Sequence, residues 1–343
     1  MPDTINSNNR KKKKQQKWLI PAIILVIAAA AAAFLVLRAL GEKERETGEG
    51  AAQGGGQGSS SGTVMWEGRE YTYNDHLSNY LLIGVDNREP VETSVGRADA
   101  GQADALYLVS WDRVENTLTM ITIPRDSMTN IETFLPSGES AGMTRDHISL
   151  SYAFGDGGHE SCRLTEEAVS NLFYGLPIQA YCAINMDGLK VLTESVGSVT
   201  VTVPNDSLAA QYPEFQAGAQ AVITPENTET FVRYRDINVS QSALARTERQ
   251  QAFITAFGEA ARARFAQDPG YAADLYLSLE PYMVTSMSTD QFVDLAESAA
   301  QGRTNEGWTV PGEGVEGVAY DEYNVDDQAL YAKIIETFYK EAE

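Results

Sequence analysis

The feature that most restricts the fold of this chain is a run of 20 uncharged, mostly apolar residues, Trp18 to Leu37. As a helix rising about 1.5 Å per residue, this run would be about 30 Å long, which matches the hydrocarbon core of a bilayer. A cleaved signal peptide has a shorter apolar core, and a buried helix of a soluble protein rarely runs so long without a polar face. The sequence therefore predicts one retained transmembrane helix, a signal-anchor, over residues 18–38.

Basic residues predict the orientation of this helix. Six of them precede it, namely Arg10, Lys11, Lys12, Lys13, Lys14 and Lys17. Arg38, Lys43 and Arg45 follow it, and the last two are interleaved with glutamates. Because basic residues collect on the cytoplasmic side, residues 1–17 should form a cytoplasmic tail. Residues 39–63 are rich in Gly, Ser and Gln and read as a flexible linker to one extracytoplasmic domain over residues 64–343.

The charge of the part after the helix is strongly acidic. Residues 41–343 contain 19 of the 26 basic residues and 47 of the 48 acidic residues, a net charge of −28. Such a domain repels nucleic acid over most of its surface, so we expect no nucleic-acid partner. The two cysteines, Cys162 and Cys182, could form a disulfide outside the cytoplasm, but two buried thiols are the favoured interpretation.

Strand and helix patterns alternate along the domain. Apolar or alternating runs predict strands at 79–85, 104–111, 118–123, 178–184, 198–203 and 308–310. Helices are predicted at 164–173, 187–196, 241–266 and 327–339, with a further helix starting at Thr224 as N-cap and Pro225 as first residue. Residues 134–147 look like a mobile lip of the expected cleft. This order predicts an α/β fold in which a mixed central sheet is sandwiched by helices on both faces.

Charged residues gather where the predicted strands end. Asp86 and Arg88 follow the first strand, Asp104 opens the second, and Arg125 and Asp126 follow the third. A further group comprises Arg233, Arg235, Arg246, Arg249 and Gln250. Fork-shaped guanidinium groups suit phosphate or pyrophosphate, and nearby aspartates suit Mg²⁺ bridging phosphate oxygens. Taken singly, each residue is more often a turn residue, a helix cap or a solvated charge than a ligand. The residues alone therefore indicate an anion-binding α/β domain.

A set of ordered motifs resembles the LytR-CpsA-Psr family. The resemblance covers residues 78–260, and its motifs are LLIGVDNR, GQADALYLVSWD, LTMITIPRDSM, SYAFGDGG, AVSNLFYGLPIQAYCAINMDGL, VGSVTVTV, FVRYRD and RTERQQAF. Members of this family are membrane-anchored phosphotransferases that move a glycopolymer from a polyprenyl-pyrophosphate carrier to peptidoglycan. The resemblance thus implies a cell membrane enzyme of cell wall assembly, with lipid-linked glycopolymer, peptidoglycan and membrane lipid as partners.

The resemblance also implies roles for individual residues. Asp86 and Asp104 would hold Mg²⁺, and Arg125, Asp126 and Asp104 would carry catalysis, with Asp126 orienting Arg125 or serving as the base. The pyrophosphate would be bound by Arg88, Arg97, Arg125, Arg233, Arg235, Arg246 and Gln250. The lipid would lie in an apolar groove between sheet and helices.

One position departs from the family pattern. The chain has Gln102 where the family usually has arginine, in a segment typically written Gly-Arg-Ser-Asp. The near-copy Gly96-Arg97-Ala98-Asp99 lies just upstream, so either Arg97 supplies the missing donor or the site lacks it. Gln102 is the main support for a second function, a regulator that binds polyprenyl phosphate or wall polymer without turnover. A third function, a lipid pyrophosphate phosphohydrolase, would use the same arginines and aspartates with water as acceptor.

Overall fold

The computed structural model describes residues 63–88, 92–236, 239, 242–268, 271–287, 291, 295, 298, 303–317 and 320–342. The predicted cytoplasmic tail, the transmembrane helix over 18–38 and all of the linker except Thr63 lie outside these residues. Within the described ranges, no helix combines the length and the apolar character needed to cross a bilayer.

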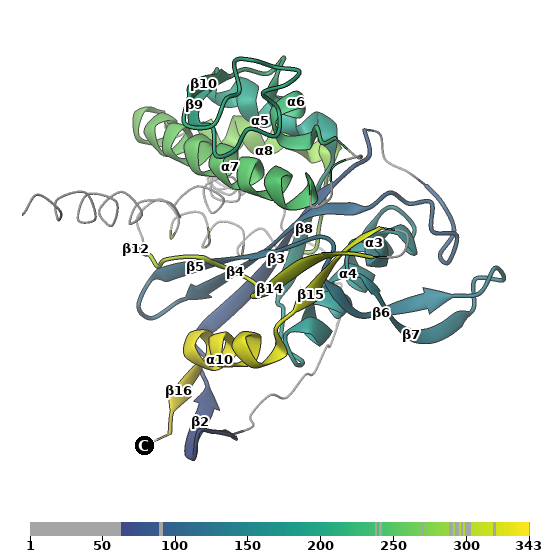
Figure 1. The fold of residues 1–343 in the computed structure, drawn as a ribbon. Coiled ribbons are helices and arrows are strands. Elements are labelled where there is room, and N and C mark those ends of the chain that lie inside the picture. The colour runs from purple at the N-terminus through teal and green to yellow at the C-terminus, as the bar shows by residue number, and fades with distance from the viewer. Residues whose placement is uncertain are drawn as a thin grey trace, which may run out of the picture.

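A mixed sheet forms the centre of the described part of the chain (Figure 1). Its strands follow the order β11-β8-β3-β4-β5-β12, and β13 also pairs with β5. The strands are β3 (Leu77–Val85), β4 (Ala103–Asp112), β5 (Thr117–Ile123), β8 (Ala180–Ile184), β11 (Met283–Thr285), β12 (Arg303–Thr304) and β13 (Trp308–Thr309). β3 pairs antiparallel with β4 and parallel with β8, so the sheet is mixed, as the sequence predicted. The predicted strands at 79–85, 104–111 and 118–123 are the central ones because their continuous apolar runs are buried on both faces.

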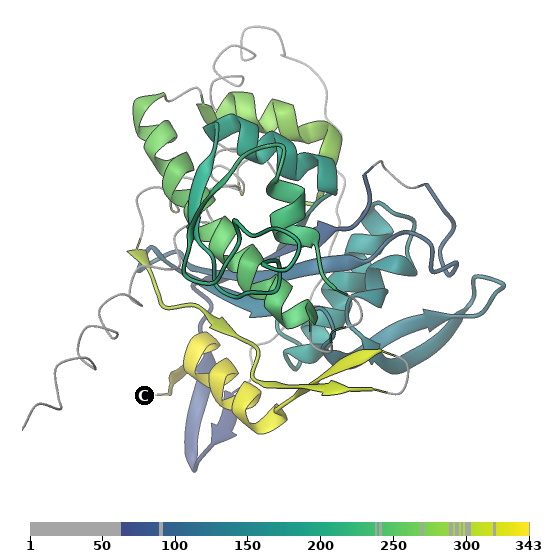
Figure 2. The ribbon, with the colours of Figure 1, turned by 45° about the horizontal axis from the view of Figure 1, so that its top comes forward.

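Helices cover both faces of this sheet (Figures 1 and 2). One face, here called the α7 face, packs Tyr107 and Val109 of β4 into one hydrophobic cluster with Phe253 and Phe257. Its helices are α5 (Met186–Val196), α6 (Thr228–Arg233), α7 (Ser242–Gln267) and α8 (Tyr271–Leu279), followed by the 3-10 turn η2 (Glu280–Tyr282). The opposite α4 face carries α3 (Leu150–Ala153), α4 (His159–Leu172) and α10 (Asp327–Phe338). The predicted sandwich is therefore present.

Smaller antiparallel pairs surround the central sheet. They are β1 (Thr63–Trp66) with β2 (Arg69–Tyr73) and β16 (Tyr339–Glu341); β9 (Val199–Thr202) with β10 (Gln220–Ile223); β14 (Gly312–Glu316) with β15 (Asp321–Val325); and β6 (Met128–Phe134) with β7 (Ser140–His147). Residues 134–147, read from the sequence as a mobile lip of the cleft, include the end of β6 and the strand β7, which the sequence did not predict. That strand is largely exposed on both sides, so it lacks the alternation that marks a strand in sequence.

Two local predictions can be compared with the described geometry. Helix α6 begins one turn later than expected, because the backbone N–H of Thr224 donates to the Asn227 side chain (2.8 Å) and closes a turn before the helix.

Cys162 and Cys182 are free and buried, as favoured from the sequence, and they belong to the clusters on opposite faces of the sheet.

Candidate functional site

A polar cleft lies on the α7 face, where β3 ends and β4 begins. It encloses about 1190 Å³, open solvent at its mouth included, and its lining residues are Asp86, Gln102, Asp104, Arg125, Glu226, Glu229, Thr230, Arg233, Tyr234, Arg235 and Arg246. Six predicted site residues from five separate segments of the chain thus come together in one place. Its four arginines balance its four carboxylates, so the lining is formally neutral within a strongly acidic domain.

Asp104 lies at the centre of this cleft because of a β-bulge. Gly84 pairs with Ala105 and Val85 pairs with Ala103, so Asp104 is the extra residue of β4. Bulges commonly redirect a side chain, and here the carboxylate lines the cleft instead of following the strict alternation of the strand. Its Oδ1 accepts from Nη1 of Arg125, and its Oδ2 accepts from Nη1 of Arg246 at 2.8 Å.

Arg125 follows β5 and is held on three sides. Its Nε donates to Oδ1 of Asp126 at 3.1 Å, and its Nη2 donates to Oε1 of Gln102. The side chain is only 13% exposed, and burial lowers its pKa to about 10, with Arg246 and Arg235 contributing to the lowering and Asp126 opposing it. This contact with Arg125 is the one that the first of the two predicted roles of Asp126, orienting Arg125, requires.

Arg246 enters the cleft from the first turns of α7 and is 3% exposed. Burial, followed by repulsion from Arg235, lowers its pKa to about 10, while Asp126 and Asp86 act in the opposite direction. Its Nε and Nη2 have no hydrogen-bond partner among the described residues. Buried guanidinium N–H groups normally have partners, so these two N–H groups are candidate donors for an anion.

Asp86 and Asp104 are the candidate ligands for a divalent cation. Oδ1 of Asp86 accepts from the backbone N–H of Gln102 at 2.7 Å. The described residues contain no cluster of three or more His, Cys, Asp or Glu side chains that could hold a metal without further ligands. Each oxygen of Asp104 already accepts from one guanidinium N–H and keeps a second acceptor site. Asp86 and Asp104 together therefore still fit Mg²⁺, because this ion is commonly bound through one or two carboxylates plus water and substrate phosphate oxygens.

Three predicted pyrophosphate ligands lie elsewhere. Arg88 does not line the cleft and instead donates to both carboxylate oxygens of Glu229 (2.7 and 2.6 Å) and to Asp187 (3.2 Å). Arg97 is also absent from the cleft lining; its side chain is 67% exposed and its Nε lies 3.8 Å from Asp99. Gln250 lies deeper, where its Nε2 donates to the carbonyl of Val232 at 3.1 Å.

Arg233 borders the cleft and pairs with Glu229 at 3.1 Å, and Arg235 lines the cleft without an ion pair to any described residue. Arg97 does not replace the arginine that the family usually has at position 102. Gln102 itself lines the cleft and contacts Arg125.

Arg249 is a residue whose role the sequence did not reveal. It is completely buried, and it donates to the carbonyls of Phe231 (2.8 Å) and Tyr234 and to the hydroxyl of Ser207. Burial lowers its pKa to about 10 as well. These bonds hold both ends of the segment that carries Arg233, so Arg249 positions the cleft wall. Its spacing of three residues from Arg246 had suggested a shared anion site on one helix face.

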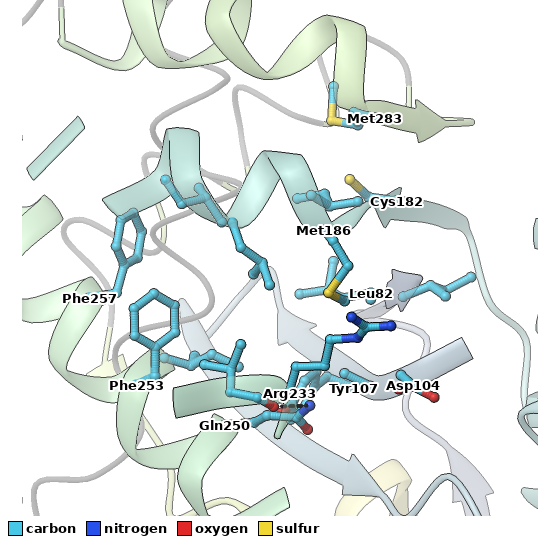
Figure 3. A pocket seen from close by; sticks show the side chains of 18 of the residues that line it. Leu82, Asp104, Tyr107, Cys182, Met186, Arg233, Gln250, Phe253, Phe257 and Met283 are labelled. Carbon is cyan, nitrogen blue, oxygen red and sulfur yellow. Dashed lines mark hydrogen bonds between the residues drawn. The ribbon is translucent and has the colours of Figure 1, made fainter. Parts of the chain in front are cut away.

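An apolar cavity adjoins the cleft (Figure 3). It lies between the sheet and helices α5 and α7 and encloses about 1040 Å³, solvent space at its mouth included. Leu82, Tyr107, Met186, Phe253 and Phe257 are among its lining residues. Asp104 and Arg233 line both the cavity and the cleft, so the two spaces meet at these residues. The arrangement fits a molecule with a phosphate at one end and a long hydrocarbon at the other.

Comparison with known proteins gives consistent matches. A sequence model of the LytR_cpsA_psr family matches residues 50–337. Polyisoprenyl-teichoic acid–peptidoglycan teichoic acid transferase TagU of Bacillus cereus (strain AH820) is 28% identical over 253 residues, which cover 73% of this chain and 74% of that protein. The solved structure of TagT bound to LI-WTA has a TM-score of 0.57 at 20% identity and covers 76% of this chain and 88% of that one. Protein gbs0355 from Streptococcus agalactiae gives 0.59 at 20% identity, with 76% and 87% covered. At 20% identity, these two structural similarities support the fold alone.

Proposed function

Because this chain belongs to the LytR-CpsA-Psr family, we propose that it transfers a wall glycopolymer from a polyprenyl-pyrophosphate carrier to peptidoglycan. The name of its Bacillus cereus relative, a teichoic acid transferase, supports this reaction and favours an anionic polymer of the teichoic acid class as donor. The protein is thus a transferase of cell wall assembly.

The observation that carries this proposal is the junction of the two spaces. Arginine side chains favour phosphate oxygens, and a cavity lined by Leu, Met and Phe favours the polyprenyl chain. With the pyrophosphate at Arg125 and Arg246, the lipid enters the cavity past Asp104 and Arg233, and the polymer extends toward solvent. A donor that lacked either the pyrophosphate or the lipid would leave one of the two spaces without a matching group.

The chemistry is phosphoryl transfer. A sugar hydroxyl of peptidoglycan attacks the phosphorus that carries the polymer, loses its proton and forms the new phosphodiester. The bond from that phosphorus to the bridging oxygen breaks, and polyprenyl phosphate leaves with the electron pair. Arg125 and Arg246 are held in place by Asp104 before the reaction, so they stabilise the developing charge without reorganising. Bound by Asp86 and Asp104, Mg²⁺ would neutralise part of the pyrophosphate charge.

The proposed location is the outer surface of the cell membrane. The apolar run over residues 18–38 would span the bilayer once, the basic tail would stay in the cytoplasm, and the linker would keep the cleft near its lipid-linked donor. Membrane lipid would therefore be a partner of the N-terminal helix as well as of the cavity.

The test is to supply full-length protein in detergent with polyprenyl-pyrophosphate-linked glycopolymer, Mg²⁺ and peptidoglycan fragments. Covalent linkage of the polymer to the fragments supports the proposed transfer. Free polymer would indicate a phosphohydrolase, and binding without turnover would indicate a regulator; either outcome rejects transfer. In the sequence, Gln102 was the main support for the regulator. Gln102 nevertheless contacts Arg125, and Arg125 still lines the cleft as the transfer reaction requires.

A further inference from the structure

Tyr107 is a buried phenol in the lining of the apolar cavity, close to Asp104 and Arg233, where the cavity meets the cleft (Figure 3). It lies on β4, three residues after Asp104, and both residues line the cavity. The residue is 4% exposed, and its hydroxyl has no hydrogen-bond partner among the described residues. A buried hydroxyl that gives up water without finding a new partner destabilises the ligand-free protein. Such a group points to a partner that arrives with a ligand.

A second buried tyrosine on the α7 face gives a useful contrast. Tyr271 is also 4% exposed and belongs to the same hydrophobic cluster. Its hydroxyl, however, shares a 2.8 Å hydrogen bond with the hydroxyl of Ser195. The unpartnered state of Tyr107 is therefore not a general property of tyrosines in this core.

The surroundings of Tyr107 indicate what the missing partner is. Figure 3 shows Gln250, Tyr107 and Asp104 along one edge of the cavity, with Arg233 next to them. The charge of Arg246 acts on the Tyr107 hydroxyl, and Arg246 has two unpartnered N–H groups of its own. A phenol and a guanidinium with unused donors thus border the same junction, and one acceptor group bound between them could satisfy both.

The protonation state of Tyr107 defines its role as a donor. Burial raises the pKa of its hydroxyl above the ordinary value, and the opposing effect of Arg246 is smaller. The phenol therefore keeps its proton at neutral pH. In this state it donates a hydrogen bond and does not act as a base.

We propose that the Tyr107 hydroxyl donates a hydrogen bond to an oxygen of the lipid-proximal phosphate, the group that leaves as polyprenyl phosphate. This inference rests on the proposed function and adds a residue that touches the leaving group from the cavity side. Negative charge grows on the leaving phosphate as its bond to the second phosphorus breaks. A fixed neutral donor in a largely apolar site stabilises that charge more than water would.

The test compares full-length wild-type protein and Tyr107→Phe in detergent micelles, with polyprenyl monophosphate and uncharged polyprenol as probes. The substitution removes one oxygen and keeps the ring. We expect affinity for polyprenyl monophosphate to fall about 10- to 100-fold, as for a hydrogen bond to a charged group, while polyprenol binds as before. The melting temperature of the ligand-free variant should equal or exceed that of the wild type, because the deleted hydroxyl has no partner to lose.

Tyr271→Phe is the matched control, since it deletes a partnered hydroxyl from the same cluster. It should lower the melting temperature and leave both affinities unchanged. Equal affinity of wild type and Tyr107→Phe for polyprenyl monophosphate would overturn the role of Tyr107, even if the wild type transfers polymer. If the wild type binds neither probe, the lipid-linked donor of the proposed function fails, and the role of Tyr107 fails with it.

Discussion

Replacing Asp104 by asparagine removes the one carboxylate that joins the two most buried arginines of the cleft. Oδ1 contacts Arg125 and Oδ2 contacts Arg246, whose side chains are 13% and 3% exposed. Asparagine keeps the shape of the side chain but has a single acceptor oxygen, and its amide N–H groups would face a guanidinium group. The variant therefore leaves two positive charges close together with a weaker link between them.

The size of the effect follows from burial. Removing one partner of a buried ion pair costs about 3–5 kcal/mol of stability, because the remaining charge is desolvated and unpaired. At about 2 °C per kcal/mol for a domain of this size, the melting temperature should fall by about 6–10 °C. Transfer should fall at least about 100-fold, as when an enzyme loses one fixed group that stabilises transition-state charge.

The assay measures thermal unfolding and transfer for the full-length variant in detergent. Asp112→Asn is the matched control, because Asp112 is a buried carboxylate at the other end of β4 that accepts from Asn74 (3.1 Å) and from the backbone of Val114 and Glu115. It should lose stability but retain transfer. An Asp104→Asn protein with transfer within about threefold of wild type would refute the reasoning that Asp104 organises the arginines.

Further variants test other parts of the site. Arg125→Ala should abolish transfer and hydrolysis alike, and a fully active variant would reject the site. Gln102→Arg should lower the melting temperature of the ligand-free protein by crowding Arg125, yet increase the stabilisation given by pyrophosphate; the reverse pattern in a thermal shift assay would contradict this. Arg249→Met should lower the melting temperature by about 6 °C or more, because three buried acceptors lose their donor. Burial raises the pKa of Cys162 above its usual range and that of Cys182 to about 12, so at pH 8 both thiols stay protonated. Ellman's reagent should therefore titrate none in the native protein and two after unfolding.

Much of the fold could be predicted because its central strands contain long, mostly apolar runs. β3, β4 and β5 are buried on both faces, and such runs are visible in sequence. β7 was missed because its side chains are mostly exposed and carry no periodic signal. The start of α6 was placed a turn early because Thr224 and Pro225 resemble a helix start, whereas the Asn227 side chain closes a turn at that point.

The site was predictable at the level of residue type but not of contact. The arginines and aspartates at strand ends indicated an anion site, yet spacing could not separate Arg246, which has unused donors, from Arg249, whose donors are taken up by the backbone and Ser207. The bulge at Asp104 also leaves no mark in the sequence, because it depends on how two strands pair. Tyr107 looked like one more residue of an apolar strand, and only its buried hydroxyl distinguishes it.

The identity of the lipid product tests the central claim most directly. Full-length protein is incubated with polyprenyl-pyrophosphate-linked polymer and Mg²⁺, with and without peptidoglycan fragments, and the released lipid is identified by mass spectrometry. Phosphoryl transfer predicts polyprenyl monophosphate, formed in step with polymer linkage and only when the acceptor is present. Release at the same rate without acceptor, or release of polyprenyl pyrophosphate, would contradict transfer at the phosphorus that carries the polymer.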